Sequence, residues 1–210
     1  TRTPVTVSER RPARARFWGP LAFPPLSRHK PARGLCAQFM ARTIRFSCTG
    51  NVCRSPMAEG LFRCLSEENK ADLIVKSAGV GAQDGQPPSG NSIRAMQDLD
   101  IDISPQRSLM LTAELAAEAD MIIGMTHGHV EMVNLMLPHA ADKAFLLREF
   151  DDTLPLHERE ISDPIGGSYE IYCQCRDQIN EGIDSLLNSI QQNKNLLPPS
   201  TQPGNEKALG

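Results

Sequence analysis

Short apolar runs alternate with helical patterns from Met40 onward, and this alternation restricts the fold more than any other feature of the sequence. The runs with the length of a strand are 43–47, 73–77, 121–125 and 144–147. Helical patterns occupy 56–68, 92–99, 112–118, 126–137 and 168–191. Strands that alternate with helices in this way are typical of parallel sheets. The sequence therefore predicts a single α/β domain with a four-stranded parallel sheet flanked by helices on both faces.

The two ends of the chain differ from this body. Residues 1–39 hold eight Lys or Arg and one Asp or Glu, a net charge of +7, whereas residues 40–210 carry −10. Because prolines interrupt 1–39 throughout, we expect a disordered basic tail there. It is a targeting arm, a contact for nucleic acid or anionic lipid, or, as we favour, non-native sequence, since Met40 stands just before the first strand. Residues 193–210, with Pro198, Pro199 and Pro203, predict a second disordered tail, which leaves 40–192 as the domain.

Apolar patterning and cysteine usage indicate the compartment. No run of eighteen apolar residues occurs, so the sequence predicts no membrane span. It also shows no secretory signal, so we expect a cytoplasmic protein with reduced thiols. The cysteine spacing fits a zinc site poorly, and we expect neither a metal nor a cofactor. The six cysteines are Cys36, Cys48, Cys53, Cys64, Cys173 and Cys175.

One segment, 45–56, carries the chemistry: Arg-Phe-Ser-Cys-Thr-Gly-Asn-Val-Cys-Arg-Ser-Pro. A strand ends at Cys48, a glycine-containing loop follows, and a helix opens near Pro56, a residue that suits the first turn. The loop amides can curl into a nest for an anion at the positive helix end. Amide dipoles and a guanidinium favour the charged form of the Cys48 sulfur. Arg54 can hold two oxygens of the same tetrahedral anion, and Ser55 can donate its hydroxyl to the thiolate.

The combination is more specific than its parts, because a lone cysteine is usually buried and inert and the Cys-x5-Arg spacing also arises by chance. The preceding strand and the residues Gly50, Asn51 and Ser55-Pro56 favour a phosphate-binding nucleophile. The run Cys-Thr-Gly-Asn-Val-Cys-Arg-Ser-Pro-Met-Ala-Glu at 48–59 resembles the signature of the low molecular weight protein tyrosine phosphatases. The resemblance extends over about 43–191.

Three further blocks resemble the same family in order and spacing: Ser-Ala-Gly at 77–79, Met-Thr-x-x-His at 125–129, and Asp-Pro-x-Gly at 163–166. The run Asp-Pro-Ile-Gly-Gly-Ser at 163–168 and the pattern Tyr-x-Gln-x-Arg-Asp at 172–177 look like the bacterial branch that includes protein arginine phosphatases. The resemblance implies a metal-independent phosphatase that acts on a phosphorylated protein or peptide and releases phosphate.

Carried over residue by residue, the resemblance implies that Cys48 is the nucleophile and forms a phosphocysteine. Arg54 binds the phosphoryl oxygens and stabilises the transition state. Asp163 protonates the leaving atom and then activates water. A neighbouring phosphate dianion favours the protonated form of such a carboxyl group. Asp151 and Asp152, in an earlier loop, are the rival acids.

The rest of the loop is implied to bind the substrate. Within it, Asn51 and Ser55 hold the loop and the thiolate, and Cys53 can form a reversible disulfide with Cys48 that guards against overoxidation. The substrate-binding residues are Thr49, Gly50, Asn51, Val52, Cys53 and Ser55.

Several positions bear on the substrate. Arginine phosphatases of the family have a threonine where Val52 stands, and tyrosine phosphatases have a branched apolar residue, so Val52 favours phosphotyrosine. Against this, Ile165 stands where an aromatic residue is usual, and Val80-Gly81 offer none, so the ring would lose stacking partners. Tyr169 compensates unless it is simply a helix-surface residue, which we favour.

Position 106 also departs from the pattern. Gln106 replaces a histidine that supports the loop in many relatives. Because an amide can still hydrogen-bond, we expect reduced rigidity of the loop and retained activity.

The sequence thus predicts a phosphotyrosine phosphatase, with a protein arginine phosphatase as the alternative. A thiol-dependent arsenate reductase is a remote alternative, because no cysteine lies between residues 65 and 172 to pass a disulfide outward. A non-catalytic phosphate-binding module is disfavoured because Cys48, Arg54 and Asp163 are all present. The −10 charge of the body argues against a nucleic-acid partner, and we expect no membrane partner.

Overall fold

The structure, a computed structural model, describes residues 42–68 and 73–192, so both predicted tails lie outside the described residues. The strands are β1 (Arg42–Cys48), β2 (Leu73–Gly79), β3 (Met121–Gly124) and β4 (Ala144–Leu146). They form one parallel sheet in the order β2-β1-β3-β4. The predicted four-stranded parallel sheet is confirmed, and β1 lies inside it.

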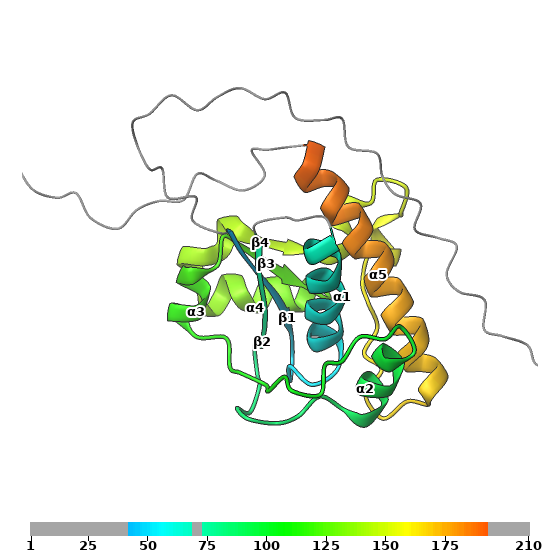
Figure 1. Cartoon of the computed structure of the whole chain (residues 1–210). Helices are drawn as coiled ribbons and strands as arrows, with labels where there is room; N and C mark the ends of the chain where they lie inside the picture. The colour runs from blue at the N-terminus through cyan, green and yellow to red at the C-terminus, as the bar shows by residue number, and fades with distance from the viewer. Residues whose placement is uncertain (1–41, 69–72, 193–210) are drawn as a thin grey trace, which may run out of the picture. The chain divides into compact units, whose positions relative to one another are not determined.

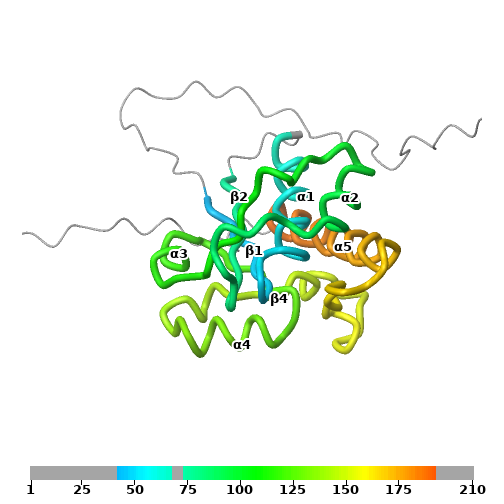
Figure 2. Tube along the Cα trace, turned by 90° about the horizontal axis from the view of Figure 1, so that it is seen from below, coloured from blue at the N-terminus to red at the C-terminus, as the bar shows by residue number. Residues whose placement is uncertain are grey.

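Helices cover both faces of the sheet, as predicted (Figure 1). Figure 2 shows α3 and α4 on one side of the strands and α1, α2 and α5 on the other. The helices are α1 (Arg54–Glu68), α2 (Gly90–Gln97), α3 (Ala113–Glu118), α4 (His127–Met136) and α5 (Tyr169–Gln192).

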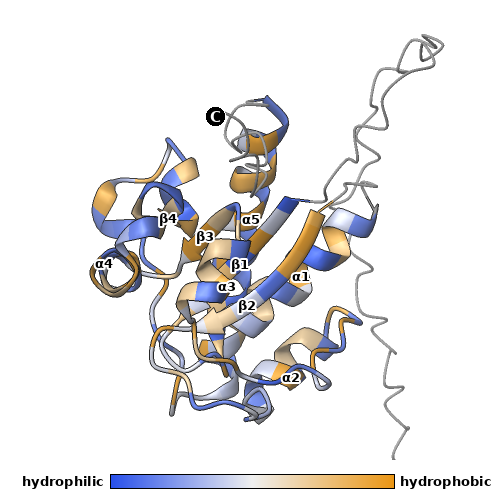
Figure 3. Cartoon of the chain, turned by 90° about the vertical axis from the view of Figure 1, so that its left-hand side faces the viewer, coloured by the Kyte–Doolittle hydropathy of each residue, from blue (hydrophilic) through white to orange (hydrophobic). Residues whose placement is uncertain are grey.

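Two apolar cores follow from the alternation of side chains along the strands. In β3, Met121 and Ile123 belong to the core shared with α1 and α5, whereas Ile122 belongs to the core beneath α3 and α4. The long helix α5 carries hydrophobic and hydrophilic residues in turn along its length (Figure 3), as expected for a helix with one buried side.

Some element boundaries differ from the predictions. Helix α1 begins at Arg54 and not at Pro56, and α2 begins at Gly90 because the Ser89 hydroxyl caps it. The predicted cap at Thr112 is confirmed. Strand β4 ends at Leu146 because the chain then turns into a short 3-10 helix. Three such helices were not predicted: η1 (Pro138–Lys143), η2 (Leu147–Phe150) and η3 (Leu156–Glu158).

The sheet positions the chemical segment at its carboxyl edge, where ligands of parallel sheets bind. Cys48, the last residue of β1, pairs with Gly79 at the end of β2. Ser47 pairs with Gly124 at the end of β3. The loop that follows Cys48 therefore emerges between the ends of two neighbouring strands.

Candidate functional site

At the start of the loop 49–53, the carbonyl oxygens of Cys48 and Thr49 accept hydrogen bonds from residues outside the loop. The Val80 amide donates to the Cys48 oxygen over 2.9 Å, and the Gly81 amide donates to the Thr49 oxygen over 3.0 Å. In a trans peptide the C=O and the following N–H point in opposite directions. The amides of Thr49 and Gly50 therefore face the inside of the loop, as an anion nest requires.

The second half of the loop continues the nest. The Ser89 amide donates to the Val52 oxygen over 2.8 Å, which turns the Cys53 amide inward. Asn51 has a φ of +54°, a left-handed conformation that asparagine tolerates better than most residues. A left-handed residue beside right-handed ones makes successive backbone amides converge on one point.

Gly79 allows β2 to approach the loop closely. A Cβ atom at this position would lie 2.4 Å from the Thr49 carbonyl oxygen and 3.0 Å from the Asn51 amide nitrogen. Only glycine fits beside the loop backbone at these distances. This explains why the Ser-Ala-Gly block ends in glycine.

A chain of hydrogen bonds connects a buried carboxylate to the Cys48 sulfur. Asn51 Nδ2 donates to the Ser55 and Ser77 hydroxyls, each over 2.9 Å. The Ser77 hydroxyl donates to Glu59 over 2.7 Å. Ser55 Oγ lies 3.0 Å from Cys48 Sγ, and because it accepts from Asn51, its proton is available to the sulfur. The distance allows the hydrogen bond expected from Ser55 to Cys48, and the support of a thiolate by Ser55 stays a prediction.

Arg54 lies at the start of α1 and is buried, with a relative exposure of 3 %. Its Nη1 donates to the Ile161 carbonyl over 3.0 Å, and its Nη2 donates to Asp163 Oδ2 over 2.6 Å. Among the described residues Arg54 Nε has no hydrogen-bond partner although it is buried. A buried N–H of this kind is costly unless a ligand accepts from it, which fits a site for an oxyanion.

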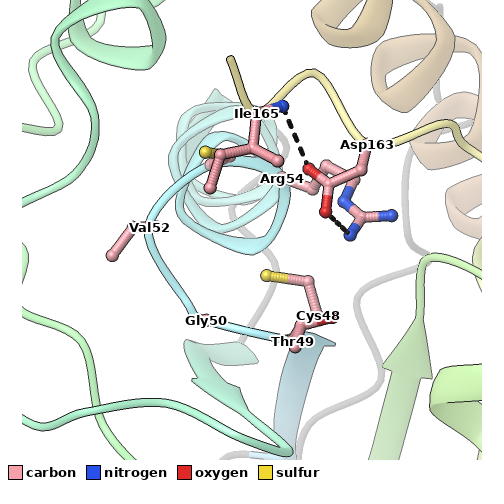
Figure 4. Close-up of a pocket in the computed structure, with 8 residues that line it drawn as sticks. Cys48, Thr49, Gly50, Val52, Arg54, Asp163 and Ile165 are labelled. Atoms are coloured by element: carbon pink, nitrogen blue, oxygen red, sulfur yellow. Dashed lines mark hydrogen bonds and ion pairs between the residues drawn. The ribbon is translucent and has the colours of Figure 1, made fainter.

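Asp163 lies on the loop before α5 and faces Arg54 (Figure 4). Its side chain is 41 % exposed, and its Oδ1 accepts from the Ile165 amide over 3.2 Å. Gly166 follows with a φ of +75°, which shapes the turn. The carboxyl group is therefore held at the pocket while remaining accessible to water.

The pocket above the loop has a volume of about 280 Å³, and Figure 4 shows the Cys48 side chain pointing into it. Seven of the nine predicted site residues line it. The other two, Asn51 and Ser55, do not line the pocket, and their side chains bond to each other and, through Ser55, to Cys48. Ile165 completes the wall. The lining residues are Cys48, Thr49, Gly50, Val52, Cys53, Arg54, Asp163 and Ile165.

Sequence reasoning missed residues that support the site from other elements. Glu59 and Ser77 stand inside motifs that the sequence shows, but their contacts with Asn51 were not predicted. His129 Nε2 lies 3.0 Å from the Thr49 hydroxyl, and this contact was also missed. The signal available was the Met-Thr-x-x-His block at 125–129, which ends in this histidine but does not show what the histidine contacts.

Two other positions bear on alternatives that the sequence left open. Tyr169 bonds to Asp98 and carries the Arg94 guanidinium 3.8 Å above its ring, so it is a helix-surface residue and not part of the pocket lining. Asp151 accepts two hydrogen bonds from Thr153 outside the pocket, and these bonds lower the pKa of its carboxyl.

The Gln106 side-chain amide was expected to hydrogen-bond to the loop, and it does not. Both of its amide atoms are buried without a partner among the described residues. Asn51 Oδ1 instead accepts from the Leu109 amide over 2.9 Å, which ties the loop to the same segment through the backbone.

The thiols near the pocket differ in environment. Cys53 Sγ lies 3.5 Å from the Tyr172 hydroxyl and 3.6 Å from that of Ser89. Burial raises the pKa of the Cys175 thiol to about 12. No disulfide joins Cys48 to Cys53 in the structure, and the reversible disulfide between them stays a prediction.

Residues 42–68 and 73–192 contain neither a cluster of metal ligands nor a helix that could span a membrane. No three His, Cys, Asp or Glu side chains in these ranges are grouped closely enough to hold a metal ion. No helix there has the length and apolar character needed to cross a membrane.

The fold brings the Cys48 thiol and the Arg54 guanidinium to one pocket, and comparisons with known proteins identify the class. The profile of the family described as low molecular weight phosphotyrosine protein phosphatase matches residues 43–196. The chain is 34 % identical over 151 residues to a protein-arginine-phosphatase of Bacillus subtilis, which covers 72 % of this chain and 98 % of that protein.

Two further comparisons agree. A probable low molecular weight protein-tyrosine-phosphatase EpsP of Ralstonia nicotianae is 30 % identical over 152 residues, covering 72 % of this chain and 98 % of that protein. A solved YwlE arginine phosphatase, in which serine replaces the active-site cysteine and is phosphorylated, superposes with a TM-score of 0.68. It is 34 % identical and covers 73 % of this chain and 99 % of that one.

The class is therefore that of cysteine-based phosphatases, which need no metal. Within it, the chain belongs to the low molecular weight phosphotyrosine protein phosphatase family, in which both tyrosine and arginine phosphatases are found.

Proposed function

We propose that this protein removes phosphate from phosphotyrosine side chains of proteins through a phosphocysteine intermediate. The observation that carries the proposal is the lining of the pocket, in which Val52 and Ile165 join Cys48 and Arg54. The valine and isoleucine give the rim apolar surface for a phenyl ring, and neither side chain offers an acceptor for guanidinium N–H groups.

The reaction proceeds in two steps. The Cys48 thiolate attacks phosphorus and the bond from phosphorus to the tyrosine oxygen breaks, while the protonated Asp163 carboxyl donates its proton to that oxygen. Water then attacks phosphorus, Asp163 takes up its proton, and the P–S bond breaks. The Ser55 hydroxyl stabilises the departing thiolate, and phosphate leaves.

Arg54 must exchange partners during this cycle. Its Nη2 donates to Asp163 over 2.6 Å and its buried Nε has no partner among the described residues, and both groups can donate to oxygens of a phosphoryl group. Binding of the dianion to Arg54 frees Asp163 from its ion pair. The carboxyl group is then available to carry the proton that the first step requires.

A second candidate is hydrolysis of phosphoarginine. One observation favours it: none of the residues that line the pocket, all within the described part of the chain, is aromatic. The likeness to a protein-arginine-phosphatase at 34 % identity points the same way. An aliphatic phosphoguanidinium needs no stacking partner.

The test compares kcat/KM of the full chain on one peptide that carries either phosphotyrosine or phosphoarginine. We expect a preference for phosphotyrosine, and we expect Val52→Thr to move the ratio toward phosphoarginine by about tenfold. Val80→Thr, outside the pocket lining, is the matched control and should leave the ratio unchanged. A preference of the wild type for phosphoarginine would establish the second candidate. Binding of phosphate without turnover of either peptide would indicate a binding module.

A further inference from the structure

His129 is buried beside the phosphate-binding loop and has no part in the reaction described above. It lies in the first turn of α4 with a relative exposure of 6 %. Gly124, at the end of β3, makes room for it, because a Cβ there would lie 3.3 Å from the His129 Cβ. The ring is therefore seated against the carboxyl edge of the sheet.

Both ring nitrogens have hydroxyl partners. His129 Nδ1 lies 2.8 Å from Thr126 Oγ1, and Nε2 lies 3.0 Å from Thr49 Oγ1. Burial, with the Arg54 charge as a second cause, lowers the pKa of the imidazole to about 4, so the ring is neutral near pH 7. A neutral imidazole has one donor and one acceptor, and the two hydroxyls satisfy both in either tautomer.

The cap of α4 accounts for only one of these contacts. Thr126 is the N-cap, and its Oγ1 accepts from the His129 backbone amide over 3.4 Å. This cap needs no imidazole. The contact from Nε2 to Thr49 instead crosses from β3 and α4 to a residue that lines the pocket.

Thr49 directly precedes the glycine of the loop. Its side chain is exposed to the pocket, and Gly50, which has wide conformational freedom, follows it. The Gly81 amide holds the Thr49 carbonyl on one side. The bond from His129 holds the side chain of the same residue, so the peptide that carries the inward Gly50 amide is fixed at two points.

We propose that His129 is a positioning residue of the phosphate-binding loop, which acts through the Thr49 hydroxyl to hold the Gly50 amide toward the bound phosphoryl group. The inference rests on the proposed function, in that it concerns the same pocket. It does not depend on which phosphorylated side chain is the substrate.

Two variants of the full chain separate positioning from simple packing. In His129→Gln the amide reaches the position of Nε2 and keeps the bond to Thr49, whereas in His129→Asn it reaches only the position of Nδ1 and keeps the bond to Thr126. We expect His129→Asn to weaken inorganic phosphate binding, measured by calorimetry, by about fivefold to tenfold. His129→Gln should stay within about twofold of the wild type.

A double-mutant cycle tests whether the effect passes through Thr49. Thr49→Val removes the hydroxyl and alone should weaken phosphate binding about as much as His129→Asn, and the two together should weaken it no further. Equal weakening by the Asn and Gln variants, or full additivity in the cycle, would overturn the proposal. Should His129→Asn fail to fold, the contrast between Thr49→Val and Thr49→Ser, which retains a hydroxyl, decides the question.

The readouts keep this inference apart from the proposed function. Phosphate affinity is measured without turnover. A wild type that binds phosphate but hydrolyses no phosphopeptide therefore refutes the proposed function, while the double-mutant cycle still tests the role of His129. A wild type with no affinity for phosphate refutes both. With p-nitrophenyl phosphate, the Asn variant should lose kcat/KM by at least the factor seen in binding.

Discussion

Arg54 Nη2 lies 2.6 Å from Asp163 Oδ2, although the two residues are 109 positions apart in the chain. The ion pair joins the proposed phosphate ligand to the proposed acid and joins the start of α1 to the loop before α5. Arg54 is buried, whereas the Asp163 side chain is 41 % exposed. The carboxylate is therefore the partner that can be displaced when a phosphoryl group arrives.

Replacement of Asp163 by Ala should slow substrates according to their leaving groups. Alkyl or unactivated aryl phosphates need a proton in the transition state, so their kcat should fall by about 10²- to 10⁴-fold. Activated aryl phosphates such as p-nitrophenyl phosphate should be affected far less. Steady-state kinetics on both substrate types gives the comparison, and Asp151→Ala is the matched control. An equal loss on both types would remove Asp163 from the role of acid.

Replacement of Cys48 by Ser should abolish turnover and leave phosphate binding in place. A serine hydroxyl is a much weaker nucleophile than a thiolate, while the loop amides and Arg54 still hold the anion. Assays with p-nitrophenyl phosphate and calorimetry with inorganic phosphate measure the two properties separately. Cys173→Ser on α5 should change neither. Residual turnover near the wild-type rate would mean that another residue attacks phosphorus.

Replacement of Gly79 by Ala should damage the site from outside the pocket. The new methyl group would lie 2.4 Å from the Thr49 carbonyl oxygen, so the loop must shift, at a cost of about 1–3 kcal/mol in the free energy of unfolding. Phosphate affinity should fall with it. Gly81→Ala is the control, because its methyl group would lie 3.7 Å from Thr49 Cγ2, an ordinary contact. Chemical denaturation and phosphate titration of the two variants give the test.

The stability of the protein should fall in mild acid because of His129. Burial lowers the pKa of its imidazole in the folded state from 6.5 to about 4. Between these values the unfolded state binds more protons, so the free energy of unfolding decreases as the pH falls, by at most ~3 kcal/mol from this residue. Above pH ~6.5 this contribution is fully present.

Urea denaturation at about pH 7 and about pH 5 measures this dependence. His129→Gln should lose it, whereas His127→Gln, at an exposed position of the same helix, should keep it. Identical pH dependence in all three proteins would show that His129 is not buried as described.

The sheet and the segment from Cys48 to Arg54 could be predicted from the sequence because each depends on residues that are close together in the chain. Cys48, Arg54 and the residues between them lie on one turn of chain between a strand and a helix, so their convergence follows from spacing alone. Asp163 lies over a hundred residues away, and its place in the pocket was predicted only through the family resemblance. Its contact with Arg54 depends on how α5 packs, which no local pattern specifies.

The remaining contacts were not predictable for a similar reason. His129 and Ser77 reach the loop because β3 and β2 are the neighbours of β1, and strand order is a property of the whole sheet. Tyr169 was assigned correctly to the surface, whereas the amide of Gln106 turned out to be unpartnered within the described residues. The Leu109 backbone amide bonds to Asn51 in place of the Gln106 side chain, and this contact depends on the exact path of a loop.

The loop 49–53 is bonded to Ser77 and His129, and Arg54 beside it is bonded to Asp163, at sequence separations of 26, 80 and 109 residues. No short fragment of the chain contains all these partners, so we expect affinity for phosphate only once the sheet is complete. A ligand that binds only the native state shifts the folding equilibrium toward it. We therefore expect inorganic phosphate, the product of the proposed reaction, to protect the protein from unfolding and from proteases that cleave unfolded chains.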